Sequence, residues 1–376
     1  MNKKRILLLS ILILSFANLG FTASKNVKMK DFIPDESNVR LLGRTIYENQ
    51  VAIMAHSATG IEFNVSAKRL TVTMVEDSWS RQSRIVAFFN GERIFDEMLR
   101  SNIKEFVIFD SAEIKQGVVQ ILKVTECTSA NVGIKKVSTD KNGSISPTAK
   151  KDIRIEFIGD SATAGYGVDE TDFTKHFRVE TEDITKSYAY KTAVALDADF
   201  SIICASGWGV VSGSTGWDKR TDMLIPDIYD KVGITKDVAV SNVKPGEIEW
   251  DFSVYEPDII IVLLGANDQT YTKHDPDKKK EYQDAYVEFI KDIREKNPDS
   301  YILCCLGIAP DYLWPEVEAA VSEYKAQSDD DYVSAFKMAL HNGQEDGFGA
   351  DYHPTEKAYE RAVKELVPKL ESILNR

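Results

Sequence analysis

Residues 153–161 read IRIEFIGDS, and this stretch decides the fold of the second half of the chain. Its apolar run predicts a buried β-strand that ends at Gly159, two residues before Ser161. Further apolar runs at 200–206, 258–265 and 301–309 predict strands of the same kind, and helical spacing appears at 188–196, 277–296 and 356–374. Continuous apolar strands that alternate with helices predict an α/β domain, residues 150–376, whose parallel sheet is covered on both faces.

The first half of the chain has a different hydrophobic pattern, in which apolar and polar residues alternate. Runs of five to nine residues alternate apolar and polar side chains, at 60–65, 69–76, 83–90, 105–110 and 118–126. Asn90-Gly91 and Gln116-Gly117 are typical of the turns between such strands. The pattern predicts an all-β sandwich or jelly roll over residues 31–145, followed by a polar boundary at 141–151.

Length and charge agree with this division. The chain has 376 residues, enough for two domains at ~100–200 residues each. Its 46 Lys and Arg against 59 Asp and Glu give a net charge of −13. No basic field exists to collect phosphates, which argues against nucleic acid and anionic membranes as partners and leaves neutral sugars open.

The N-terminus reads as a targeting segment. A basic start, MNKKR, precedes the apolar run 6–16, which is too short for a ~20-residue membrane span. We interpret residues 1–23 as a signal peptide and predict a secreted or periplasmic protein; an uncleaved anchor is the alternative. Cys127, Cys204, Cys304 and Cys305 are predicted to be core residues, because no motif with metal-ligand spacing accompanies them.

Chemistry-bearing residues follow the predicted strands. Ser161 stands on a strand-to-helix turn, where its hydroxyl could attack and its N–H could face an oxyanion; an N-capping serine is the alternative. Gly207 and Gly209 follow the second strand, and Asn267 follows the third; turns or helix caps would also explain them. Among five histidines, His353 alone stands at a strand-to-helix junction of this half, where it could act as general base.

The series GDS at 159–161, Gly207, GAND at 265–268 and His353-Pro354 resembles the four blocks of the SGNH (GDSL-type) hydrolases. The resemblance implies that Ser161 is the nucleophile and His353 the base. It also implies an oxyanion hole of the Ser161 N–H, the Gly207 N–H and the Asn267 side chain, with Gly209 as second choice for Gly207. No metal and no organic cofactor is implied.

The first half looks like the jelly-roll domain of carbohydrate esterase family 2, on Gly43-Arg44 and on LKVTE at 122–126. This resemblance implies a secreted bacterial enzyme that removes acetyl groups from plant polysaccharides or oligosaccharides. A lipase or acyl-thioesterase, and a glycan-binding module with weak esterase activity, are the alternatives. Trp208 and Tyr352 are candidate sugar-binding residues, and Trp217 fits a sugar site or the core equally well.

One departure from the pattern concerns the third catalytic group. SGNH enzymes commonly carry Asp three residues before the histidine, where this chain has Ala350; its nearest acid is Asp351. Family 2 esterases often work with a Ser-His dyad whose ring is oriented by a backbone carbonyl. We therefore predict a dyad and leave open whether Asp351 assists it.

Overall fold

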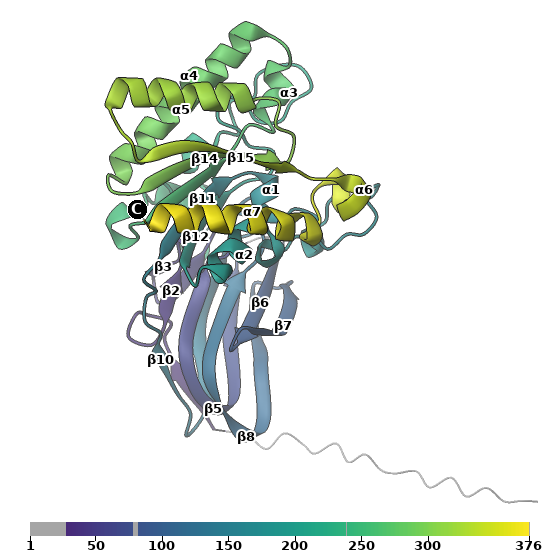
Figure 1. Cartoon of the computed structure of the whole chain (residues 1–376). Coiled ribbons are helices and arrows are strands. Elements are labelled where there is room, and N and C mark those ends of the chain that lie inside the picture. Colours follow the sequence, from purple (N-terminus) through teal and green to yellow (C-terminus); the bar gives the residue numbers. More distant parts are fainter. Residues whose placement is uncertain (1–27, 78–81, 238, 376) are drawn as a thin grey trace, which may run out of the picture.

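The computed structural model describes residues 28–77, 82–237 and 239–375, so the predicted signal peptide lies outside the described residues. The chain forms two regions, which we call the β-domain (residues 29–147) and the α/β domain (residues 154–374). In Figure 1 the β-domain extends below the parallel sheet, and the C-terminal helix runs across that sheet. Among the described residues, no helix is long and apolar enough to cross a bilayer.

The α/β domain contains one five-stranded parallel sheet in the order β12-β11-β13-β14-β15. These strands are β11 (Arg154–Gly159), β12 (Asp199–Cys204), β13 (Ile259–Leu263), β14 (Tyr301–Ile308) and β15 (Val333–Leu340). Successive side chains of a strand enter opposite cores. Phe157 packs on the side of α2 (Tyr188–Ala195) and α7 (Glu356–Leu374), whereas Ile158 packs on the side of α4 (Pro276–Lys296) and α5 (Trp314–Ser328). The predicted three-layer α/β/α architecture is confirmed.

Short elements at the carboxyl ends of the strands shape the loops. They are α1 (Ser161–Ala164), α3 (Asp268–Thr272), α6 (Gly343–Asp346) and the 3-10 turn η6 (Ala350–Tyr352). Two of the long helices that adjoin these loops, α4 and α7, each have a side-chain cap at the N-terminus. Asp275 accepts from the N–H of Asp277 at 3.0 Å at the start of α4, and Thr355 accepts from the N–H of Ala358 at 3.4 Å at the start of α7.

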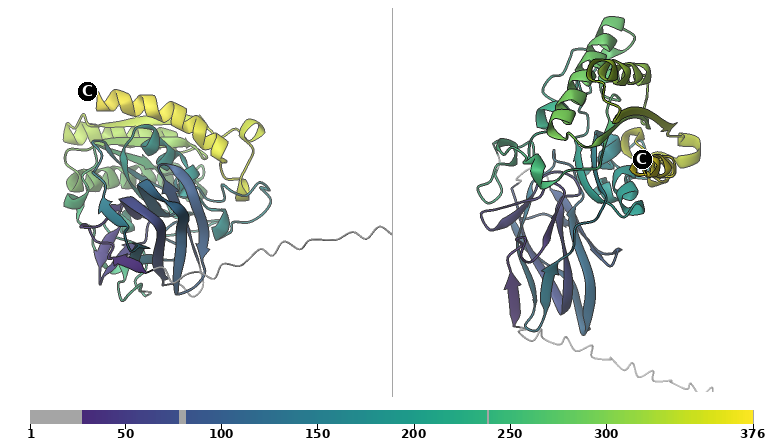
Figure 2. Two further views of the ribbon diagram at one scale, coloured as in Figure 1. Left: turned by 90° about the horizontal axis from the view of Figure 1, so that it is seen from below. Right: turned by 60° about the vertical axis from the view of Figure 1, so that its left-hand side comes forward.

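The β-domain is an antiparallel sheet built around two long strands. Its strands are β1 (Met29–Phe32), β2 (Arg40–Leu42), β3 (Ile46–Glu48), β4 (Val51–Met54), β5 (Gly60–Glu76), β6 (Ser83–Phe89), β7 (Glu92–Leu99), β8 (Ile103–Lys123), β9 (Val132–Asp140) and β10 (Ser144–Pro147). β5 pairs with β8 along its length; on its other side it pairs with β2 and β10 near its start and with β9 near its end. Figure 2 shows these strands running side by side away from the α/β domain.

Two of the predicted turns have different outcomes. Asn90-Gly91 connects β6 and β7, and both residues have positive φ, as a tight hairpin turn requires. Gln116-Gly117, in contrast, lies inside β8, so the prediction of a turn there was wrong. The glycine serves close packing instead, because a Cβ at Gly117 would lie 2.3 Å from the Asn90 Oδ1 atom, which accepts from the Val118 N–H at 2.8 Å. The predicted polar boundary at 141–151 likewise contains β10.

The β-domain abuts the β12 edge of the parallel sheet. Arg40 on β2 forms ion pairs with Asp199, the first residue of β12, and with Glu62 on β5 at 2.6 Å. Arg44 is fully buried and donates to the Lys231 carbonyl at 3.1 Å. An exposed edge strand can pair with other chains and cause aggregation, so the contact with the β-domain also protects the β12 edge.

Candidate active site

Ser161 is the first residue of α1, and only Asp160 separates it from the end of β11. Asp160 is the N-cap of this short helix, and its side chain accepts from the Ala162 N–H at 3.0 Å. Capping by Asp160 leaves Ser161 free of that structural role, which was the alternative reading of its position. Within the described part of the chain, no acceptor is recorded for the Ser161 N–H.

His353 follows η6 and faces Ser161. Its Nε2 atom lies 2.9 Å from the Ser161 Oγ atom, although 192 residues separate the two in sequence. Its Nδ1 atom lies 3.2 Å from the Ala350 carbonyl oxygen and 3.3 Å from that of Asp351. Two carbonyl acceptors favour the tautomer with a proton on Nδ1, which leaves the Nε2 lone pair directed at the serine hydroxyl. Burial lowers the pKa of His353 below its usual value.

The Asp351 carboxylate is engaged away from the His353 ring. Its oxygens accept from the Tyr166 hydroxyl at 3.0 Å and from the Phe177 N–H at 2.9 Å, and lie 2.8 Å from the His176 Nδ1 atom. The bonds to residues 176 and 177 hold the turn η6 against the loop 169–178. They also stabilise the positive φ of 49° at Asp351, a backbone angle that is unfavourable for a residue other than glycine. Ala350, where the family commonly has Asp, is fully buried against Gly167, and a Cβ at Gly167 would lie 2.4 Å from that of Ala350.

The loop after β12 separates the two candidate glycines. The Gly209 N–H donates to the Met223 carbonyl at 3.1 Å, so its proton is already used. The Gly207 N–H has no recorded acceptor among the described residues, and its φ of 83° suits only glycine without strain. Asp268 anchors the same loop by accepting from the N–H groups of Val211 at 2.7 Å and Ser212 at 3.0 Å.

Asn267 lies beside this loop with both amide protons engaged. Its Nδ2 atom donates to the Trp208 carbonyl at 2.8 Å and to the Asp160 Oδ2 atom at 3.1 Å. Burial raises the pKa of Asp160 to about 7, so near neutral pH only part of the Asp160 population carries the charge that makes it a strong acceptor for the Asn267 amide. Among the described residues, no acceptor is found for the N–H groups of Ser161 and Gly207, and the third predicted donor, Asn267, is shared between two acceptors.

The candidate sugar-binding aromatics differ in exposure. The Trp208 ring is half-buried against the core on the α4 side. Tyr352 is 60% exposed and packs 4.9 Å from Phe173, measured between ring centroids. Trp217 is 84% exposed, which removes the core interpretation for it.

Sequence reasoning missed Tyr166. Its ring centroid lies 4.1 Å from that of His353, and its other neighbour is the stacked ring of Phe177 at 4.2 Å. Tyr166 therefore covers one face of the imidazole. The only sequence signal was its place five residues after Ser161.

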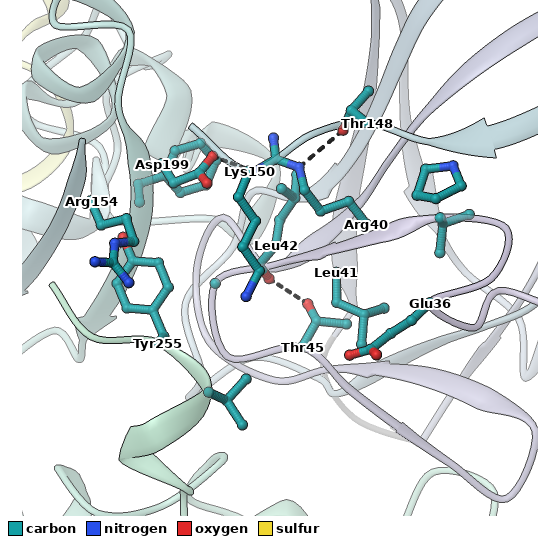
Figure 3. A pocket seen from close by; sticks show the side chains of 15 residues that line it. Glu36, Arg40, Leu41, Leu42, Thr45, Thr148, Lys150, Arg154, Asp199 and Tyr255 are labelled. Carbon is teal, nitrogen blue, oxygen red and sulfur yellow. Dashed lines mark hydrogen bonds and ion pairs between the residues drawn. The ribbon is translucent and has the colours of Figure 1, made fainter. Parts of the chain in front are cut away.

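A cavity of about 270 Å³ lies at the opposite, amino-terminal ends of the strands. Figure 3 shows Arg40, Asp199, Arg154 and Tyr255 around it, at the junction of the two domains. Arg40 is held there by Thr148 and Asp199, and the Tyr255 hydroxyl donates to the Ile155 carbonyl at 3.1 Å. This cavity contains neither Ser161 nor His353. In the described part of the chain, no group of three potential metal ligands comes together.

Comparison with known proteins places these residues in a family. A sequence-family model, described as "GDSL-like Lipase/Acylhydrolase family", matches residues 157–361 of this chain. The cellulase/esterase CelE of Acetivibrio thermocellus is 29% identical over 227 residues, which are 59% of this chain but only 26% of that protein. An acetylxylan esterase/glucomannan deacetylase of Cellvibrio japonicus is 24% identical over 350 residues, 90% of both chains. The solved structure of a family two carbohydrate esterase from Clostridium thermocellum in complex with cellohexaose has the same fold, with a TM-score of 0.78 and 23% identity over 90% of this chain and 99% of that one.

Proposed function

This chain belongs to the GDSL-like lipase/acylhydrolase family and is an esterase, and we propose that it hydrolyses acetyl esters of plant polysaccharides or oligosaccharides through a Ser161–His353 dyad. The observation that carries the proposal is the 2.9 Å contact between the Ser161 Oγ and His353 Nε2 atoms, together with the N–H groups of Ser161 and Gly207, for which no acceptor is found among the described residues. A nucleophile, its base and oxyanion donors are the parts that acyl transfer needs.

The reaction proceeds through an acetyl-enzyme. His353 Nε2 takes the Ser161 proton as Oγ attacks the acetyl carbonyl carbon, and the N–H groups of Ser161 and Gly207 donate to the oxyanion. His353 then gives its proton to the departing sugar oxygen. A water molecule then attacks the acetyl carbon and loses a proton to His353, which passes this proton to Ser161 Oγ as the ester bond breaks, so that acetate leaves and Ser161 is free again.

We infer a dyad because the His353 Nδ1 atom faces backbone carbonyl oxygens and not a carboxylate. The Ala350 carbonyl holds the ring orientation, a role that a carboxylate fills in a triad. The imidazolium exists only while the proton is in transit, so a neutral acceptor suffices, although a carboxylate would stabilise it more. Asn267 becomes the third oxyanion donor when its N–H turns from Asp160, its longer partner, towards the developing charge.

Exposed aromatic rings support a sugar substrate. Tyr352 adjoins His353, and Trp217 lies on the loop that bonds the Gly207 carbonyl through the Ser214 N–H at 2.7 Å. Such rings stack on the apolar faces of sugars, and the half-buried Trp208 is the third candidate ring. The Cellvibrio japonicus relative is named an acetylxylan esterase/glucomannan deacetylase, and we assign the same class of substrate, acetylated glycans, to this chain. We also propose export after removal of residues 1–23, which N-terminal sequencing of the mature protein tests.

The deciding experiment compares acetate release from acetylated xylan, acetylated glucomannan and simple sugar acetates. We expect release from these by the wild type and none by Ser161→Ala. A parallel series of para-nitrophenyl acetate, butyrate and octanoate separates the alternatives. Preference for octanoate would replace the sugar esterase with a lipase or thioesterase, and glycan binding without acetate release would indicate a binding module.

A further inference from the structure

A segment of the β-domain, residues 123–127, lies against the loop that carries Gly207. It begins at Lys123, the last residue of β8, whose ammonium is fully buried. This ammonium donates to the carbonyls of Thr125 at 2.6 Å and Glu126 at 2.8 Å. A buried charge with these partners fixes the chain in a tight path directly after the strand.

From this path the segment contacts the end of β12 at two points. The Cys127 Sγ atom lies 3.3 Å from the Cys204 carbonyl oxygen, to which it donates. The Glu126 Oε2 atom accepts from the Ser206 N–H at 2.7 Å, and its other oxygen accepts from the Thr128 hydroxyl. Glu126 is only 4% exposed, so its charge-assisted bond to Ser206 is shielded from water.

The bond to Ser206 acts on the turn that presents Gly207. The Trp208 N–H donates to the Ala205 carbonyl at 3.2 Å, and the positive φ of Gly207 is what the third position of a type II turn requires. Glu126 holds the peptide before Ser206, and the Ser214 N–H holds the Gly207 carbonyl at 2.7 Å. The turn is therefore fixed on both sides of the Gly207 N–H, for which no acceptor is found among the described residues.

We propose that Glu126 is a positioning residue for the oxyanion hole, supplied by the β-domain to the α/β domain. This inference rests on the proposed role of Gly207 as an oxyanion donor. Preorganised donors stabilise a transition state because they need no reorganisation during the reaction. Without Glu126 the turn gains freedom, and the Gly207 N–H spends less time directed at the oxyanion. The β-domain is then part of the catalytic apparatus as well as a cover for the sheet edge.

The test compares Glu126→Ala, Glu126→Asp and Glu126→Gln with para-nitrophenyl acetate as substrate. Losing a whole oxyanion donor costs ~10²–10³ in kcat, so loosening one is expected to cost about 10- to 100-fold in Glu126→Ala. KM should stay within about twofold, because the ground-state carbonyl needs these donors least. Glu126→Gln keeps an acceptor oxygen and should recover kcat to within about threefold of the wild type. Glu126→Asp, which keeps the charge but falls short of Ser206, should lie between them.

Glu62→Ala is the matched control. Glu62 is another buried carboxylate at the domain junction, 9% exposed, and it pairs with Arg40 at 2.6 Å far from Gly207. We expect Glu62→Ala to lower Tm and leave kcat unchanged. The proposal is overturned if Glu126→Ala keeps wild-type kcat, if Glu126→Gln loses as much as Glu126→Ala, or if Glu62→Ala loses as much kcat as Glu126→Ala. A wild type inactive on every ester tested would instead overturn the proposed function.

Discussion

The two ends of the parallel sheet use polar groups in opposite ways. At the amino-terminal ends, Arg40 satisfies Asp199 and Glu62, and the Arg154 N–H donates to the Asp258 carboxylate at 2.7 Å. At the carboxyl ends, the N–H groups of Ser161 and Gly207 have no recorded acceptor among the described residues. Ser161 and Gly207 are only partly buried, so their N–H groups are available to a substrate at the carboxyl ends of the strands, where open α/β sheets bind their ligands.

Removing the proposed nucleophile should cause the largest loss of activity. Ser161→Ala deletes the hydroxyl that lies 2.9 Å from His353 Nε2, and we expect kcat for acetate release to fall by ~10⁴-fold or more. Ser372→Ala, at an exposed serine of α7, is the control and should retain full activity. Comparable activity in Ser161→Ala and the wild type would exclude a serine mechanism at this site.

Asn267→Ala should have the next largest effect. The amide is shared between Trp208 and Asp160 in the free protein, and its donation to the oxyanion predicts a loss of ~10²–10³ in kcat, about 3–4 kcal/mol. Asn297→Ala removes a buried asparagine that donates to the Tyr229 hydroxyl at 2.8 Å, far from Ser161 in the fold. That control should lose stability alone, and equal kcat losses in the two variants would remove Asn267 from the oxyanion hole.

Asp351→Ala tests the dyad directly. Its carboxylate holds Tyr166, His176 and the Phe177 N–H instead of the His353 ring, so we expect about a tenfold loss in kcat through a looser turn. Asp351→Asn keeps one acceptor oxygen and should lose less. A loss above ~10³-fold, about 4 kcal/mol, in Asp351→Ala would show that the carboxylate works as the third member of a triad.

The pH profile of kcat/KM should report the burial of His353. The base must be neutral, and burial lowers the pKa of His353 below 6.5, so activity should be retained as pH falls to that value and be lost only below it. Tyr166→Ala uncovers one face of the ring, which should move the acid limb upward towards 6.5. An acid limb above 6.5 in the wild type would contradict this account of the imidazole environment.

Much of the α/β domain could be predicted because its central strands are buried on both faces. β11, β13 and β14 read as continuous apolar runs, and the family model that covers residues 157–361 confirms the predicted resemblance. The edge strand β15 was not predicted, since it is partly exposed and carries Ser334 and Lys337 among its apolar residues. Its mixed pattern gives neither a strand period nor a buried run.

Contacts between distant segments were outside the reach of sequence reasoning. The series of strand ends identified Ser161 and His353 as candidates, and the structure brings their side chains together. The engagement of Asn267 with Asp160, the ring of Tyr166 against His353 and the reach of Glu126 to Ser206 depend on tertiary packing. No local pattern encodes them. The prediction of a turn at Gln116-Gly117 was wrong for the same reason. Glycine is needed there because the Asn90 side chain, 27 residues earlier, packs against it.

Arg40→Met should have the smallest effect on activity and a large effect on stability. The substitution leaves Glu62 and Asp199 without their cation at a site where the Arg40 side chain is 9% exposed, and breaking a buried pair costs ~3–5 kcal/mol. We expect urea unfolding to show this loss while kcat at 25 °C stays within about twofold, because no oxyanion donor touches Arg40. The triple variant Arg40→Met, Glu62→Gln, Asp199→Asn should recover part of the stability, since no charge is then left unpaired. A kcat loss in Arg40→Met that persists in the triple variant would mean that the amino-terminal junction also sets the geometry at Ser161, and the two ends of the sheet would have to be treated as one coupled unit.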